Sequence, residues 1–159
     1  MKIFVPDNFQ PPLEHICEDF VLRPLQYKYA EIDYMAVMSS IDVIHKVRSG
    51  SWPTPELTLE ENKIDLGWHQ REFEFNQSFA YIAWDKNTNK HLGCVYFYRT
   101  ELPWVDAPVD SDVDVNLWVT TEAYDRGLYT KLFACVKKWV KEEWPFENPY
   151  FSNKEIPQI

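Results

Sequence analysis

Residues 112–119 read Asp-Val-Asp-Val-Asn-Leu-Trp-Val, and residues 120–127 continue Thr-Thr-Glu-Ala-Tyr-Asp-Arg-Gly. Valine and leucine alternate with mostly polar residues in the first segment, which predicts a half-buried β-strand. From Leu128 to Trp144 apolar residues recur at helical spacing while lysines take the other face, and Pro145 ends the pattern. The stretch therefore predicts a strand, a polar turn and a long amphipathic helix.

The turn before this helix is a candidate anion site. A strand that feeds a helix through a short turn leaves the first N–H groups of the helix unpaired, at the positive end of its dipole. Arg126 adds positive charge there, and Gly127 lets a ligand approach the backbone closely. The alternative interpretation is an ordinary strand–turn–helix crossover of an α/β domain.

Length and composition limit the class of protein. A chain of 159 residues that is 45% hydrophobic and 16% aromatic predicts one globular domain. Its four glycines argue against a glycine-rich nucleotide-binding scaffold. The net charge of −9 argues against nucleic acid as a partner, because binding phosphates requires clustered lysine and arginine. If the substrate is charged, a cation such as an amine is favoured.

The cysteines and the apolar runs bear on the compartment. Cys17, Cys94 and Cys135 are odd in number and lack metal-ligand spacing, so we expect buried thiols in a reducing environment and no metal. The N-terminus does not read as a signal peptide, and no apolar run approaches about 18 residues. We therefore expect a cytoplasmic protein without a membrane partner.

The other elements follow in a regular order. Residues 1–19 predict an extended lead-in with one short strand, and Thr58 with Glu61 forms a capping box that begins a helix. Strands are expected at residues 20–25, 79–84, 92–98 and 148–152, and helices at residues 26–38, 41–47 and 58–74.

The segment from Leu117 to Thr130 resembles the acyl-CoA-binding segment of the GNAT N-acetyltransferases, whose signature is Q/R-x-x-G-x-G/A. Gly127 keeps the central glycine, whereas Tyr124 replaces the leading Gln or Arg and Tyr129 fills the final small position. The order of elements extends the resemblance from residue 20 to about residue 152. It implies an α/β (α+β) fold with a mixed, mostly antiparallel sheet flanked by helices and splayed between the fourth and fifth family strands. The domain would span residues 20–159 and be short at its C-terminus.

The resemblance also implies an activity and a co-substrate. The protein would move an acetyl group from acetyl-CoA directly to a small amine or an exposed amino group, as an acyl-CoA-dependent N-acyltransferase. Main-chain groups of the fourth strand would hold the pantetheine, and those of the turn would hold the pyrophosphate. The cofactor-binding residues implied are Leu117, Trp118, Val119, Tyr124, Asp125, Arg126, Gly127, Leu128, Tyr129, Thr130 and Lys131.

Proton transfer needs a base for the amine and an acid for the leaving thiolate. Aligning residues 114–119 on the family's typical E-I-G-Y-W-V places Asp114 where many members carry a glutamate, so Asp114 is the candidate base. The alternatives are a solvent-facing strand residue or an electrostatic clamp for a cationic acceptor. His69 and His91 are other candidate bases, and Tyr150 is the nearest candidate acid; structural roles are the alternative for each.

Aromatic residues could form the acceptor site, because tryptophan rings attract cationic amines. The candidates for substrate binding are Trp52, Trp68, His69 and Trp104, with Trp118 as a further aromatic; core or loop anchoring is the alternative.

Two other functions remain open. One is a non-catalytic GNAT-like domain that binds acyl-CoA or another protein, which the tyrosines at 124 and 129 and the short C-terminus favour. The other is an α+β domain that holds an apolar ligand in its aromatic interior. A homodimer is compatible with the sequence, and the oligomeric state stays open.

Overall fold

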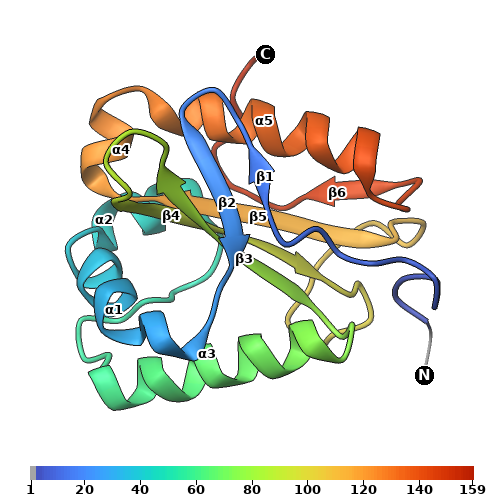
Figure 1. The fold of residues 1–159 in the computed structure, drawn as a ribbon, viewed down its shortest axis with the longest axis horizontal. Helices are drawn as coiled ribbons and strands as arrows, with labels where there is room; N and C mark the ends of the chain where they lie inside the picture. The colour runs from blue at the N-terminus through green and yellow to red at the C-terminus, as the bar shows by residue number, and fades with distance from the viewer. Residues whose placement is uncertain (1–2) are drawn as a thin grey trace.

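A computed structural model describes residues 3–159 and contains a six-stranded sheet in the order β1-β2-β3-β4-β5-β6 (Figure 1). Neighbouring strands are antiparallel except β5 and β6, which are parallel. The strands are β1 His15–Ile16, β2 Phe20–Pro24, β3 Phe79–Asp85, β4 His91–Tyr98, β5 Val113–Val119 and β6 Pro149–Phe151. This mixed, mostly antiparallel sheet confirms the predicted fold class.

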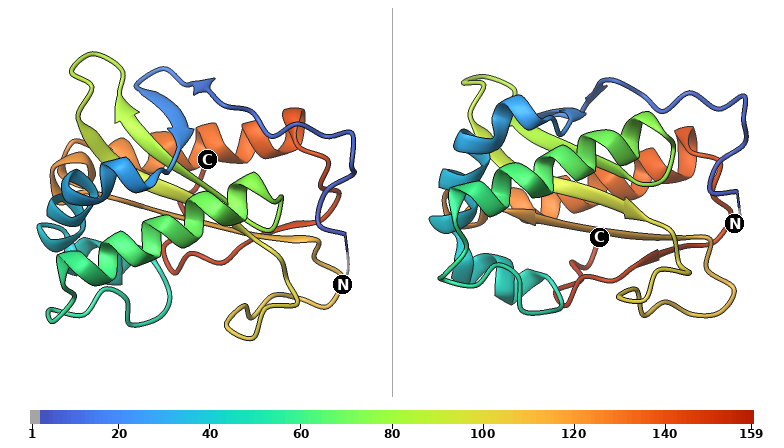
Figure 2. Two further views of the ribbon diagram at one scale, coloured as in Figure 1. Left: turned by 60° about the horizontal axis from the view of Figure 1, so that its bottom comes forward. Right: turned by 90° about the horizontal axis from the view of Figure 1, so that it is seen from below.

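Helices cover both faces of the sheet. Figures 1 and 2 show α1 to α3 on one side of the strands and α5 on the other. The segment with α4 and α5 is the crossover that a parallel pair such as β5 and β6 requires. The helices are η1 Tyr27–Tyr29, α1 Ala30–Met38, α2 Ile41–Val47, α3 Leu59–Glu74, α4 Thr121–Asp125 and α5 Leu128–Glu143. Within residues 3–159, none of them is long and apolar enough to cross a bilayer.

Local sequence signals explain most element boundaries. Thr58 caps α3: its side chain accepts from the Glu61 N–H, and the Glu61 carboxylate accepts from the Thr58 N–H. The predicted short strand in the lead-in is β1. Just before this strand, the Tyr81 hydroxyl donates to the Pro12 carbonyl at 2.8 Å and so holds the lead-in against the sheet. The predicted helix at residues 26–38 begins as the 3₁₀ turn η1, and the predicted turn at residues 120–127 contains α4.

The prediction that the strand at residues 112–119 is half-buried is wrong. All seven residues of β5 are buried, including Asp114 and Asn116, each 4% exposed. The alternation did not reveal this because β5 lies inside the sheet with helices on both sides. Its valines and Leu117 lie on the α5 side, whereas Asp114, Asn116 and Trp118 lie on the side of α1 to α3, where polar groups of other elements pair with them.

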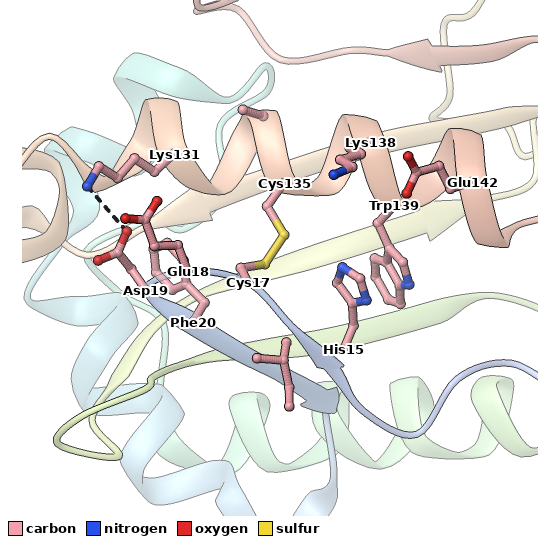
Figure 3. Close-up of a pocket in the computed structure, with 12 residues that line it drawn as sticks. His15, Cys17, Glu18, Asp19, Phe20, Lys131, Cys135, Lys138, Trp139 and Glu142 are labelled. Carbon is pink, nitrogen blue, oxygen red and sulfur yellow. Dashed lines mark ion pairs between the residues drawn. A yellow bond between two sulfur atoms is a disulfide. The ribbon is translucent and has the colours of Figure 1, made fainter.

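The prediction of reduced thiols is wrong for two of the three cysteines. Cys17 and Cys135 form a disulfide between the chain after β1 and α5, whereas Cys94 is free and buried. Figure 3 shows this bond beside His15 and Trp139, whose rings stack 4.6 Å apart. The sequence could not reveal the pair, because the two residues are 118 positions apart and only the docking of β1 on α5 brings their Cα atoms to 6.1 Å.

Candidate active site

The two candidate catalytic residues are neighbours in the sheet. Asp114 on β5 is in register with Tyr150 on β6 and with Tyr98 on β4. Residues opposite one another in a sheet point to the same face, so these three side chains share the face that carries α1 to α3. The fold therefore places the predicted base beside the predicted acid, although 36 positions separate them in the sequence.

The environment of Asp114 suits a proton acceptor. Oδ2 accepts from Asn116 Nδ2 at 3.1 Å, whereas the buried Oδ1 has no hydrogen-bond partner among residues 3–159. Burial raises the pKa of Asp114 above its ordinary value, and this effect outweighs the opposing influence of the nearby Ser152, of the Asn116 hydrogen bond and of the Arg48 charge. The alternative of a solvent-facing Asp114 is wrong, since the residue is buried.

Arg48 joins this carboxylate to a neighbouring hollow. Its Nε donates to Asn116 Oδ1 at 2.7 Å, and Asn116 in turn donates to Asp114. The guanidinium lies over the ring of Tyr96 at 4.7 Å and near that of Trp52 at 5.4 Å. No signal in the sequence pointed to Arg48, because this residue follows α2 directly and lies 68 positions before Asn116.

A hollow of about 380 Å³ lies between α3, the loop after α2 and β4. All four predicted acceptor residues line it, so the fold brings them together. The complete lining is Arg48, Trp52, Asp65, Trp68, His69, Glu72, Tyr96, Tyr98 and Trp104. We call this hollow the α3 pocket. No signal in the sequence pointed to Asp65 and Glu72, which occupy ordinary polar positions of an amphipathic helix.

The histidines and Trp118 take different places. His69 lines the α3 pocket; its Nε2 lies 3.5 Å from an Asp65 carboxylate oxygen, and its buried Nδ1 has no partner in the described chain. His91 instead forms a buried pair with Asp33 at 2.7 Å, outside that pocket. Trp118 is fully buried, and its indole N–H donates to the Tyr96 hydroxyl at 2.9 Å, so it supports the wall of the pocket.

The predicted pantetheine edge of β5 is occupied by protein. The β5–β6 ladder ends at Val115 and Phe151, and beyond it the Asn153 side chain pairs with Leu117. Asn153 Oδ1 accepts from the Leu117 N–H at 3.0 Å, and Nδ2 donates to the Leu117 carbonyl at 2.8 Å. Strand pairing thus stops before Leu117, and a side chain takes the place of the next strand residue.

At the predicted pyrophosphate turn, Gly127 has a φ of +74° and precedes α5 without any side-chain cap on that helix. The Arg126 guanidinium lies 3.3 Å from an Asp85 carboxylate oxygen, and Lys131 lies 3.4 Å from one of Asp19. Leu128 and Val119 are buried, whereas Asp125 and Thr130 are exposed. The uncapped helix start leaves main-chain donors for an anion, but the nearby cations already have carboxylate partners.

The two tyrosines that depart from the family signature hold the C-terminal segment. The Tyr124 hydroxyl donates to Glu155 Oε1 at 2.8 Å, and the Tyr129 hydroxyl donates to the Glu155 carbonyl at 2.5 Å. Asn153 Nδ2 also donates to the Tyr129 hydroxyl at 2.9 Å. Both substitutions therefore have a structural explanation in the segment from Ser152 to Glu155.

A second hollow, of about 500 Å³, lies beside the Cys17–Cys135 disulfide (Figure 3). Of the predicted site residues, only Lys131 lines this hollow. The hollow lies against α5, on the opposite face of the sheet from Asp114. We therefore place the candidate active site at the α3 pocket and Asp114.

Comparison with known proteins gives relatives by structure only. No family model matches the chain, and no curated protein sequence matches it. A Vibrio cholerae protein named as a ribosomal-protein-serine acetyltransferase superposes with a TM-score of 0.68 at 10% identity, over 90% of this chain and 75% of that one. The ribosomal L7/L12 α-N-protein acetyltransferase RimL in complex with coenzyme A gives 0.59 at 12% identity, over 79% and 66%. A Bacillus anthracis acetyltransferase of the GNAT family gives 0.52 at 15% identity, over 81% and 67%. This chain has the fold of the GNAT N-acetyltransferases.

Proposed function

We propose that this protein is an acyl-CoA-dependent N-acyltransferase that moves an acetyl group from acetyl-CoA to an amine. The observation that carries the proposal is the position of Asp114, a buried carboxylate with an unpaired oxygen, linked through Asn116 and Arg48 to the α3 pocket. The GNAT fold supports it, since the similar structures are named as acetyltransferases and one of them contains coenzyme A.

The residues divide the chemistry between them. Asp114 takes a proton from the acceptor amine, and the freed nitrogen forms the new C–N bond to the acetyl carbon while the C–S bond of the thioester breaks. We assign the proton donated to the leaving thiolate to the Tyr150 hydroxyl, and the register of Tyr150 with Asp114 supports this assignment. Main-chain groups of β5 near Leu117 and the uncapped start of α5 would hold the pantetheine and the pyrophosphate.

Cofactor binding requires a local rearrangement. Pantetheine can use the Leu117 N–H and carbonyl only after the Asn153 side chain leaves them. Its binding therefore competes with the hydrogen bonds that hold Asn153 and Glu155. We expect acetyl-CoA affinity to be reduced by the fraction of molecules in which this segment is closed.

The direct test is release of free CoA thiol from acetyl-CoA in the presence of a panel of small amines and amino acids. The wild-type protein should release thiol with at least one acceptor, and Asp114→Asn should be slower. Asp110→Asn is the matched control, because Asp110 is an exposed carboxylate in the loop before β5. No release across the panel would count against the transferase.

The same observations at Leu117 favour a second candidate, a GNAT-like domain that does not transfer acyl groups. If Asn153 and the two tyrosines keep the Leu117 edge of β5 closed permanently, acetyl-CoA should not stabilise the protein. A binder should gain about 2.7 kcal/mol at a ligand concentration of 100 times Kd. The absence of a shift in thermal unfolding at millimolar acetyl-CoA would favour a domain that does not bind it, and a shift without thiol release would favour a domain that only binds.

A further inference from the structure

We infer that the acceptor is a free α-amino acid, whose carboxylate binds Arg48, whose α-amine faces Asp114 and whose side chain occupies the rest of the α3 pocket. The inference rests on the proposed function and adds to it the class of acceptor. Its key feature is the requirement for a carboxylate next to the amine.

Arg48 is prepared to bind a carboxylate. Its orientation is fixed by the Nε bond to Asn116 and by contact with the rings of Tyr96 and Trp52. Within residues 3–159, no hydrogen bond or ion pair engages its two Nη groups. A guanidinium held in this way presents parallel N–H donors that match the two oxygens of a carboxylate.

Arg48 and the base lie close together, on either side of Asn116. The hydrogen bond from Arg48 Nε to Asn116 Oδ1 is 2.7 Å long, and the one from Asn116 Nδ2 to Asp114 Oδ2 is 3.1 Å long. A cation and a carboxylate are therefore separated by a single amide side chain. An α-amino acid carries its ammonium and carboxylate on one carbon, so it complements both groups at once. A simple amine would meet the Arg48 charge without compensation.

The outer part of the α3 pocket suits an aromatic or a basic side chain. Trp68 and Trp104 are largely exposed at its rim, which is unusual for such large apolar rings. Asp65 and Glu72 add two carboxylates to the lining. The volume of about 380 Å³ falls in the range of small-molecule sites, which begins at about 300 Å³. His69 contributes a buried, unpaired Nδ1 to the same wall.

The carboxylate separates this acceptor from a protein N-terminus. The α-amine of a peptide is followed by a neutral amide, which offers Arg48 no negative charge. Similar structures are named for acting on ribosomal proteins, so the peptide terminus is the natural rival. A comparison between an amino acid and its amide therefore tests the inference directly.

The test measures thiol release from acetyl-CoA with phenylalanine, phenylalaninamide and phenethylamine, and repeats the series with lysine and lysinamide. The amino acid should exceed its amide in kcat/KM by at least about tenfold, since a site built for a polar group rejects analogues that lack it. Arg48→Met should bring this ratio close to one, and Arg48→Lys should keep part of it. Arg71→Met, an exposed arginine on α3, should leave the ratio unchanged.

Equal kcat/KM values with the amino acid and its amide, or an unchanged ratio of these values in Arg48→Met, would overturn the inference. The proposed transferase function would be unaffected by either result. If no acceptor is acetylated, the proposed function fails, and binding alone then decides this inference. Phenylalanine or lysine, but not its amide, should raise the melting temperature of the wild-type protein and not that of Arg48→Met. Absence of this difference for both amino acids would reject the amino-acid site.

Discussion

The side chain of Asn153 pairs with both main-chain groups of Leu117, accepting from its N–H at 3.0 Å and donating to its carbonyl at 2.8 Å. An amide side chain here replaces the next residue of a neighbouring strand. Nδ2 also lies 2.9 Å from the Val47 carbonyl and 2.9 Å from the Tyr129 hydroxyl. One buried residue thus connects β5, the end of α2 and the start of α5, at the edge where the cofactor would bind.

Asn153→Ala should have two effects in opposite directions. Stability should fall by about 1–3 kcal/mol, because the buried groups of Leu117 lose their partner. Affinity for acetyl-CoA should rise, because the ligand no longer competes with the side chain. Urea unfolding and titration calorimetry measure the two effects, and Lys154→Ala, an exposed neighbour, is the control. Unchanged or weaker affinity would show that Asn153 does not compete with the cofactor.

Tyr129→Phe should loosen the C-terminal segment by removing one hydroxyl. That hydroxyl donates to the Glu155 carbonyl and accepts from Asn153, so its loss should cost about 1 kcal/mol. Tyr124→Phe removes a bond to the Glu155 carboxylate at a half-buried position and should cost less. Denaturant unfolding gives both values. A larger loss of stability in Tyr124→Phe than in Tyr129→Phe would mean that the Glu155 carboxylate holds the C-terminal segment more strongly than the Glu155 carbonyl does.

The sequence contained enough to predict the sheet, the capping box and the amphipathic helix, because these depend on residues close together in the chain. It also gave the four residues that meet in the α3 pocket. It did not reveal Arg48, Asn116 and Asn153, whose roles depend on contacts across 68 and 36 positions. A single polar residue carries no periodic signal, so only the folded chain shows its partner.

Removing the Cys17–Cys135 bond should lower stability by about 2–5 kcal/mol, because the link closes a long loop in the unfolded chain. Cys17→Ser should unfold at lower urea concentration than the oxidised wild type. Added reductant should shift the wild type towards the variant and leave the variant itself unchanged. Wild-type protein that is insensitive to reductant would mean that the bond does not form in solution.

Asp114→Asn should stabilise the protein at neutral pH. Burial raises the pKa of Asp114 in the folded state above the 3.8 of an ordinary aspartate, so the folded protein binds this proton more tightly than the unfolded chain. The stability that Asp114 contributes is present below that ordinary value and is lost as pH rises through the folded-state pKa. Asparagine can still accept from Asn116 and carries no charge. The variant's advantage in urea unfolding should shrink as pH falls towards 3.8; a destabilised variant at pH 7 would mean that the carboxylate is favourably paired.

The same substitution should slow acetyl transfer by about 10²–10⁴-fold, the contribution typical of a positioned general base. In the wild type, kcat/KM should fall as pH drops through the raised pKa of Asp114, because the protonated acid cannot accept the amine's proton. Asp114→Asn should lose that low-pH decline, while its affinity for acetyl-CoA stays unchanged. A carboxylate that lowers stability but raises the rate serves catalysis. If Asp114 were only structural, its substitution would leave the low-pH decline of kcat/KM unchanged. Equal turnover in the two proteins would therefore assign the base to another group, for which His69 in the α3 pocket is a candidate.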